Sequence, residues 1–293
     1  MISIIMPAYN EEKYISKAIE SILNQTIKEF QLIIVNDGST DKTSEIVRTY
    51  EKKYKNIECI EPGKIGKNSA FNLAAKLVTG DWIYFMGADD VLPFNALEIW
   101  EKQTLNSSSS DLVVLSGKMK IISDNPKYSD LILPKKKKRL NYSGPLTLMS
   151  KQVLNNILPL PTNFPNEDTW WSLYFRFFVK NQIKVNEIIV YYRIHNNNAI
   201  SKNLNFDDFS LKYHSRYIVR IEFIERFKNN LSHKELKQLN TEMKIEHLRY
   251  NKKTFSIIFS KGLNAKDKIR TVFFSSKFLY SIKIKLDRYF LGH

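Results

Sequence analysis

Residues 2–37 read ISIIMPAYNEEKYISKAIESILNQTIKEFQLIIVND, and this stretch decides the fold. Residues 2–6 form a short apolar run that Pro7 ends, and residues 32–35 form a second, partly β-branched run. Between the two runs, apolar residues recur at helical spacing. They are Ile15, Ala18, Ile19, Ile22 and Leu23. The stretch therefore predicts a strand, a helix capped by Asn10, and a second strand.

The same alternation continues through the first hundred residues. The predicted elements are, in order, a helix capped by Ser39 or Thr40, a strand at 57–60, a helix at 68–78 closed by Gly80, a strand at 82–86 and a helix begun by Pro93. Strands at 112–115, 118–122 and 183–194 come later, together with a helix at 170–179 that is either buried or faces an apolar ligand. Buried strands separated by helices indicate an α/β fold, a mostly parallel sheet with helices on both faces. We expect this domain to span residues 1–204.

Composition excludes several classes of protein. The 293 residues are 43% hydrophobic and 26% charged, as in ordinary globular chains, so wholesale disorder is excluded. No apolar stretch is long enough to span a membrane as a helix. Cys59 is the one cysteine, which excludes a disulfide framework and a multi-cysteine zinc site. The opening residues resemble a strand more than a signal peptide, and a cytoplasmic location is expected.

Positive charge is concentrated toward the C-terminus. The net charge is +15, and residues 205–293 hold 19 Lys and Arg against 9 Asp and Glu, a net of +10. From residue 206 the pattern is helical, so we expect a basic helical region over 205–293. Such a region suits an anionic partner, which can be membrane lipid, nucleic acid or another protein.

Acidic residues follow two of the predicted strands. Asp37 ends the strand at 32–35, and Asp89 and Asp90 follow the strand at 82–86. Ligands of open parallel sheets bind beyond the carboxyl ends of the strands, where carboxylates can accept hydrogen bonds from a nucleotide or hold Mg²⁺ or Mn²⁺. The alternative is that these residues cap the helices that follow. The glycines of residues 63–66 do not match the dinucleotide-binding fingerprint, because a third glycine is missing and the stretch follows the third strand.

Three motifs in order resemble the family-2 glycosyltransferases of GT-A fold, in particular those of bacterial surface polysaccharides. They are PAYNEE at 7–12, VNDGSTD at 35–41 and GDWIYFMGADD at 80–90. The resemblance implies inverting transfer of a sugar from a nucleotide-sugar, with a UDP-sugar favoured, to a hydroxyl of a glycan or lipid-linked acceptor. It also implies a Mn²⁺ or Mg²⁺ cofactor.

The resemblance assigns residues to the donor site and the metal site. The nucleotide-sugar residues that it implies are Pro7, Ala8, Asn10, Glu11, Asp37, Asn72 and Ala88, and the metal ligands are Asp89, Asp90 and His195. The alternative role for His195 is contact with the diphosphate. Asp37 would accept hydrogen bonds from the base or the ribose. One position departs from the family pattern: Gly87 stands where the first Asp of the Asp-x-Asp motif is expected, and Asp90 is the carboxylate that would compensate.

Residues 166–168 read NED, and two tryptophans follow at 170 and 171. This stretch resembles the family's Glu-Asp motif, which implies Asp168 as the base that deprotonates the acceptor, supported by Glu167. On position alone the pair would cap the following helix.

The last predicted helix carries an apolar stripe and a basic face. The stripe comprises Leu279, Ile282, Leu286, Tyr289 and Phe290. A helix of this kind lies in a membrane interface or packs on the catalytic domain or a second subunit; we favour an anionic membrane surface, with the enzyme peripheral at the inner face of the cytoplasmic membrane. The alternative to a transferase is a non-catalytic family member, or a basic protein that binds membrane or nucleic acid. No nucleic-acid recognition motif is present, so no nucleic-acid partner is expected.

Overall fold

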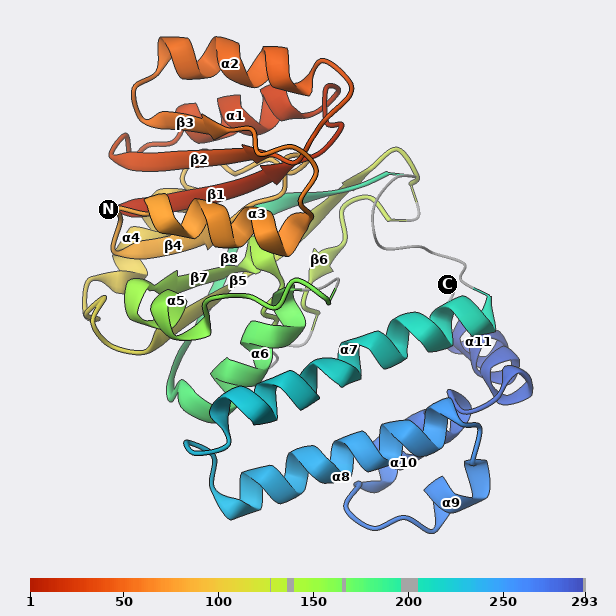
Figure 1. The fold of residues 1–293 in the computed structure, drawn as a ribbon. Coiled ribbons are helices and arrows are strands. Elements are labelled where there is room, and N and C mark those ends of the chain that lie inside the picture. The colour runs from red at the N-terminus through yellow and green to blue at the C-terminus, as the bar shows by residue number, and fades with distance from the viewer. Residues whose placement is uncertain (127, 136–139, 165–166, 196–204, 292–293) are drawn as a thin grey trace. The chain divides into compact units, whose positions relative to one another are not determined.

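The computed structural model describes residues 1–126, 128–135, 140–164, 167–195 and 205–291. These fall into two compact units, Met1–Asn198 and Ala199–His293, and Figure 1 colours them along the chain. Whether the two fold as separate domains, as the expected boundary at residue 204 implies, stays a prediction.

The described part of the first unit contains an eight-stranded sheet. Its strands are β1 (Ile2–Ala8), β2 (Phe30–Asn36), β3 (Ile57–Ile60), β4 (Trp82–Phe85), β5 (Val113–Ser123), β6 (Ile132–Leu133), β7 (Thr147–Ser150) and β8 (Asn181–Ile194). Seven lie in the order β3-β2-β1-β4-β7-β5-β6, and β8 pairs with β5. β1, β2, β3 and β4 are mutually parallel, as are β5 and β8, whereas β6 and β7 are antiparallel to their neighbours. The expected mostly parallel sheet is confirmed.

Helices cover both faces of this sheet. They are α1 (Ile15–Leu23), α2 (Thr43–Lys53), α3 (Lys67–Ala74), α4 (Ala96–Thr104), α5 (Lys151–Ile157) and α6 (Glu167–Phe178). One hydrophobic cluster contains side chains of β1 and β4 together with buried residues of α1, α2 and α4. On the other face, Phe85 of β4 contacts Phe71 of α3 and Trp171 of α6, with ring centroids 4.7 and 4.9 Å apart.

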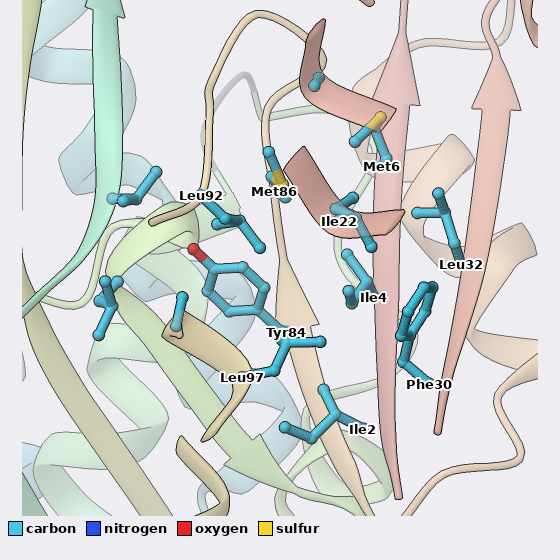
Figure 2. Close-up of a cluster of buried hydrophobic side chains, with 14 of the residues drawn as sticks. Ile2, Ile4, Met6, Ile22, Phe30, Leu32, Tyr84, Met86, Leu92 and Leu97 are labelled. Atoms are coloured by element: carbon cyan, nitrogen blue, oxygen red, sulfur yellow. The ribbon is translucent and has the colours of Figure 1, made fainter. Parts of the chain in front are cut away.

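Successive side chains of β1 pack on opposite faces of the sheet and contribute to the hydrophobic core on each face. Ile2, Ile4 and Met6 point into the first cluster, where Figure 2 shows them beside Phe30 of β2 and Tyr84 of β4. Because successive side chains of a strand point to opposite faces, Ile5, which is fully buried, lies on the other layer. Full burial of each such side chain contributes roughly 1.5–3 kcal/mol, so this strand is a main source of stability.

Two of the expected helix caps are wrong. α1 begins at Ile15, not next to Asn10, and Asn10 has a left-handed backbone with φ of 55°. Its side-chain oxygen accepts a hydrogen bond from the N–H of Thr40 (2.8 Å), so it joins the loops after β1 and β2. α2 begins at Thr43, beyond Ser39 and Thr40. Asn and Asp side chains satisfy backbone groups in loops as readily as at helix ends, which is why spacing alone misplaced these caps.

Gly80 also has a different role from the one expected. α3 ends at Ala74 and continues as a 3-10 turn to Leu77, so Gly80 does not close the helix, and its φ is not positive. A Cβ at Gly80 would lie 2.7 Å from Ser3 Oγ and 2.9 Å from Met1 O. The glycine is needed because the chain passes this close to the start of β1.

The two predicted strands at 112–115 and 118–122 form one strand, β5. Its pairing with β8 shifts register between Ser116 and Lys118, and this irregularity accounts for the interruption in the apolar pattern.

The second unit is helical, as expected, with α7 (Phe206–Phe227), α8 (His233–Tyr250), α9 (Thr254–Ile258), α10 (Ala265–Phe273) and α11 (Lys277–Leu291). α7 packs along α8, and Figure 1 shows the two side by side. The fully buried Arg249 joins these helices, because its guanidinium donates to Glu246 Oε1 (2.6 Å), Ser210 Oγ (2.9 Å) and the carbonyl of Phe274 (3.2 Å). None of the helices in the described residues is both long enough and apolar enough to cross a membrane.

Candidate active site

The candidate site lies at one edge of the sheet in the first unit. β7 is antiparallel to both β4 and β5, and β8 is parallel to β5, so β8 runs in the same direction as β1, β2 and β4. The carboxyl ends of these four strands therefore share one edge. Glu11 follows β1, Asp37 follows β2, Asp89 follows β4 and His195 follows β8, which is the placement that open parallel sheets use for ligands.

Three of these side chains converge. Ligand atoms of Glu11, Asp89 and His195 all lie within 4.8 Å of one another, and His195 Nε2 is 3.1 Å from Asp89 Oδ2. Burial, then repulsion from Asp89 and Asp41, raises the pKa of Glu11 to about 7. Two carboxylates and an imidazole form a donor set that suits Mn²⁺ or Mg²⁺. Glu11 was expected near the nucleotide; its position in this cluster was missed, although its place after β1 pointed to the same edge.

Asp90 lies outside this three-residue group. It is 1% exposed, and its Oδ1 accepts a hydrogen bond from the backbone N–H of Arg193 (3.0 Å). Its Oδ2 is buried and has no hydrogen-bond partner among the described residues. Burial and the neighbouring Asp89 raise the pKa of Asp90 well above its ordinary value. Its assignment as a metal ligand stays a prediction, while its observed contact fixes the end of β8 beside β4.

The close packing of Asp89 and Asp90 explains the glycine at position 87. A Cβ there would lie 2.7 Å from Asp89 Oδ1 and 2.8 Å from Asp90 Oδ2. Any side chain at this position would displace one of the two carboxylates, so an aspartate cannot occupy it while Asp89 and Asp90 keep these positions.

Tyr14 and Arg193 support His195, and no pattern in the sequence singled out Tyr14. Arg193 Nε donates to the carbonyl of Asp89 (2.9 Å), and its guanidinium lies 4.7 Å from the centre of the Tyr14 ring. The Tyr14 ring is in turn 5.1 Å from that of His195. These contacts orient the imidazole toward Asp89.

Asp37 lies under the glycine-containing loop at 63–66. Its Oδ1 accepts from the N–H groups of Ile65 (2.7 Å) and Gly66 (2.8 Å), and Lys64 Nζ is 3.0 Å from its Oδ2. Burial acts to raise the pKa of Asp37, but these donors outweigh it and the pKa is lowered. Lys64 also lies 3.0 Å from the centre of the Tyr9 ring. Contact of Asp37 with a base or ribose stays a prediction.

The remaining predicted nucleotide residues connect elements around this edge. The carbonyl of Ala8, which follows Pro7 in β1, accepts from the N–H of Asp37 (2.8 Å). Asn72 uses both ends of its amide on the backbone of Leu160, at 2.8 and 2.6 Å. Ala88 is buried in the first hydrophobic cluster. Their roles in nucleotide binding stay predictions.

Glu167 and Asp168 occupy the first turn of α6, which lies near the end of β4 through the contact of Trp171 with Phe85. Glu167 is buried and pairs with Lys67 Nζ (2.6 Å), a partner that the sequence did not suggest. Burial raises the pKa of Tyr192, and the charges of Asp90, Asp89, Asp168 and Glu167 raise it further. Asn166 lies outside the described residues.

Comparison with known proteins agrees with this geometry. The model of the family described as "Glycosyl transferase family 2" matches residues 3–158, more than half of the chain. The poly(ribitol-phosphate) beta-glucosyltransferase of Bacillus spizizenii is 36% identical over 126 residues, 42% of this chain and 19% of that protein. The minor teichoic acid biosynthesis protein GgaB of Bacillus subtilis is 43% identical over 99 residues, 33% of this chain and 11% of that protein. The matched residues thus cover less than a fifth of either relative.

Solved structures share the fold at low identity. TarS 1–349 of S. aureus, in complex with UDP-GlcNAc, has a TM-score of 0.61 at 18% identity and covers 96% of this chain and 83% of its own. Mannosyltransferase PcManGT of Pyrobaculum calidifontis, in complex with GDP-Man and Mn²⁺, has a TM-score of 0.58 at 14% identity and covers 98% and 80%. With its GT-A fold and its match to the family model, the chain belongs to glycosyl transferase family 2 and is related to enzymes of teichoic acid and polysaccharide synthesis.

Proposed function

We propose that the chain is an inverting glycosyltransferase that moves a sugar from a nucleotide-sugar, with a UDP-sugar favoured, to a hydroxyl of a glycan or lipid-linked acceptor in bacterial surface polysaccharide synthesis. The observation that carries the proposal is the convergence of Glu11, Asp89 and His195 at the carboxyl edge of the sheet. The UDP-GlcNAc complex of TarS and the GDP-Man and Mn²⁺ complex of PcManGT support a nucleotide-sugar donor and a divalent metal.

Mn²⁺ or Mg²⁺ fits the residues of this cluster. The raised pKa of Glu11 reflects its burial beside the like charge of Asp89, and a divalent cation would offset that repulsion. When bound, such a cation neutralises the diphosphate of the donor and stabilises it as the leaving group. Glu11, Asp89 and His195 would hold the cation, and Tyr14 and Arg193 keep His195 in place.

Asp168 is the base of the proposed reaction. Its carboxylate takes the proton of the acceptor hydroxyl as that oxygen forms a bond to the anomeric carbon, and the bond from this carbon to the diphosphate breaks on the opposite face. Glu167, held by Lys67, positions the first turn of α6. Asp37, Asn10, Pro7, Ala8, Asn72 and Ala88 are the proposed surroundings of the nucleotide. An anionic membrane surface remains the proposed partner of residues 205–293, and the enzyme's location is proposed as the inner face of the cytoplasmic membrane.

Calorimetric titration of UDP, GDP and dTDP, with and without Mn²⁺, tests the proposal. We expect Mn²⁺-dependent binding of one nucleotide, lost in Asp89→Ala and kept in the matched control Asp111→Ala, which changes an exposed aspartate before β5. No binding of any of the three nucleotides under either condition would contradict the proposal and favour a non-catalytic family member.

Asp168→Asn should separate chemistry from binding. Loss of a general base lowers turnover by about 10²–10⁴-fold, while nucleotide affinity should stay as in the wild type. Turnover of the donor sugar, by transfer or by hydrolysis, is measured together with calorimetry. Normal turnover in this variant would show that Asp168 is not the base.

A further inference from the structure

Large apolar side chains are exposed at one short helix of the second unit. Phe255 is 79% exposed, Phe259 81% and Ile258 44%. At a spacing of three and four residues they lie on one side of α9 and its C-terminal residue, and we call these three residues the α9 patch. Ile257, fully buried, anchors the other side of the helix.

The α9 patch is held in place by contacts on both sides. Lys268 Nζ, from α10, donates to the carbonyl of Ile258 (2.9 Å). The hydroxyls of Thr254 and Ser275 are 2.8 Å apart, and the N–H of Lys253 donates to the carbonyl of Leu248 (2.8 Å). The patch is therefore presented on a fixed backbone, and little conformational entropy would be lost when it binds a partner.

The positive charge of the helical region is concentrated in its second half, which contains this patch. Residues 251–286 hold nine Lys and Arg against one acidic residue, Asp267, a net of +8. Residues 205–250 hold nine against seven, a net of only +2. Lys252 and Lys253, just before α9, and Lys261, just after Phe259, are all exposed.

Part of the apolar stripe expected on α11 is half-buried, and its membrane contact stays a prediction. Tyr280 stacks on Phe209 of α7 with ring centroids 4.5 Å apart, and Leu279 and Ile282 are half-buried. The start of α11 therefore packs within the second unit, and the side chains of Tyr289 and Phe290 lie outside the described residues. On α11, Phe278 (72% exposed) and Leu286 (40%) are also exposed, and the α9 patch adds two phenylalanines that are more exposed still.

We propose that the α9 patch inserts into the interface of an anionic lipid bilayer, with Lys252, Lys253 and Lys261 at the headgroups. Anionic lipid attracts each nearby cation by about 1 kcal/mol, and the acyl boundary takes up apolar side chains. A second copy docking patch to patch would set a net +8 against a net +8. A nucleic acid would pair its phosphates with the lysines, but it would not bury the three apolar side chains of the α9 patch in an apolar environment. The inference is independent of the transferase activity, because the patch and the catalytic residues lie in different units.

Vesicle flotation of the full chain tests this inference. We expect flotation with vesicles of phosphatidylcholine plus about 30% phosphatidylglycerol and none with phosphatidylcholine alone, and loss of binding at about 0.5 M salt. Phe255→Ser with Phe259→Ser should weaken binding by about tenfold or more, and Lys252→Gln with Lys253→Gln and Lys261→Gln should weaken it similarly. Leu211→Ser, at a residue of α7 that is 59% exposed, is the matched control and should bind normally.

Three results would overturn the inference. These are no flotation with anionic vesicles, flotation unchanged by the two Phe substitutions, and a dimer or a complex with single-stranded DNA that depends on the same phenylalanines in the absence of lipid binding. Circular dichroism and nucleotide calorimetry on each variant separate this question from the proposed function. A chain that floats but binds no nucleotide contradicts only the transferase proposal.

Discussion

Asp37 and Glu11 follow neighbouring parallel strands, yet their surroundings affect them in opposite ways. Asp37 receives two backbone N–H groups and the ammonium of Lys64, and its pKa is lowered despite burial. Glu11 is buried beside Asp89 and Asp41, and its pKa is raised to about 7. The protein already neutralises Asp37, whereas Glu11 lies beside like charges that a bound cation would offset. Strand-end position alone therefore does not distinguish a carboxylate that neighbouring donors neutralise from one that lies beside like charges.

Glu11→Gln should remove the destabilisation that the charged side chain of Glu11 causes in the folded protein. An acid whose folded pKa is raised destabilises the fold once pH rises above its ordinary pKa of 4.5, and the full cost is present above about 7. In the absence of divalent cation we expect the variant to gain about 2 kcal/mol in free energy of unfolding at pH 8 and nothing near pH 4. Urea unfolding at both pH values measures this, and Mn²⁺-dependent nucleotide binding should weaken in the same variant. An equal change in the free energy of unfolding at both pH values would show that the charge of Glu11 is not the cause.

Gly87→Ala tests whether nucleotide binding depends on the positions of the Asp89 and Asp90 carboxylates, which pack closely against Gly87. The added Cβ would lie within 2.8 Å of both carboxylates and must move at least one of them. We expect Mn²⁺-dependent nucleotide affinity to fall by about tenfold, with a smaller effect on stability. Asp111→Ala, at an exposed aspartate before β5, serves as the control. Unchanged affinity in Gly87→Ala would mean that these carboxylate positions do not matter for binding.

Asp37→Asn should change the free energy of unfolding in the opposite direction to Glu11→Gln. Because the folded pKa of Asp37 lies below the ordinary 3.8, its contribution is present above that pH and lost as pH falls through the folded pKa. The variant should lose about 1 kcal/mol in free energy of unfolding at pH 7, since Lys64 is largely exposed and solvent screens the pair. The difference should shrink as pH falls below 3.8 and vanish below the folded pKa. A stability loss that persists there would show that the charge of Asp37 is not the cause.

The periodic parts of the chain could be predicted from sequence, and the contacts between distant residues could not. Apolar runs and helical spacing located β1, α1 and β2, and the rule for strand ends brought Asp37 and Asp89 to one edge. The cluster of Glu11, Asp89 and His195 could not be predicted from spacing, because these residues are 78 and 106 positions apart along the chain. The order of the strands in the sheet brings them together.

Two local interpretations failed for a related reason. Asn10 fits a helix cap in sequence, but a loop 30 residues away offers its side chain a backbone N–H. Gly80 fits the end of a helix in sequence, but α3 ends at Ala74 and the glycine instead lies against Met1 and Ser3. In both cases the deciding neighbour is fixed by tertiary structure.

Mn²⁺ binding measured by electron paramagnetic resonance, in the presence of UDP, tests the central claim most directly. The signal of free Mn²⁺ should fall as wild-type chain or Asp111→Ala is added, and Asp89→Ala should bind at least about tenfold more weakly. Equal binding by Asp89→Ala and the wild type would contradict the claim that the Glu11, Asp89 and His195 cluster holds the metal.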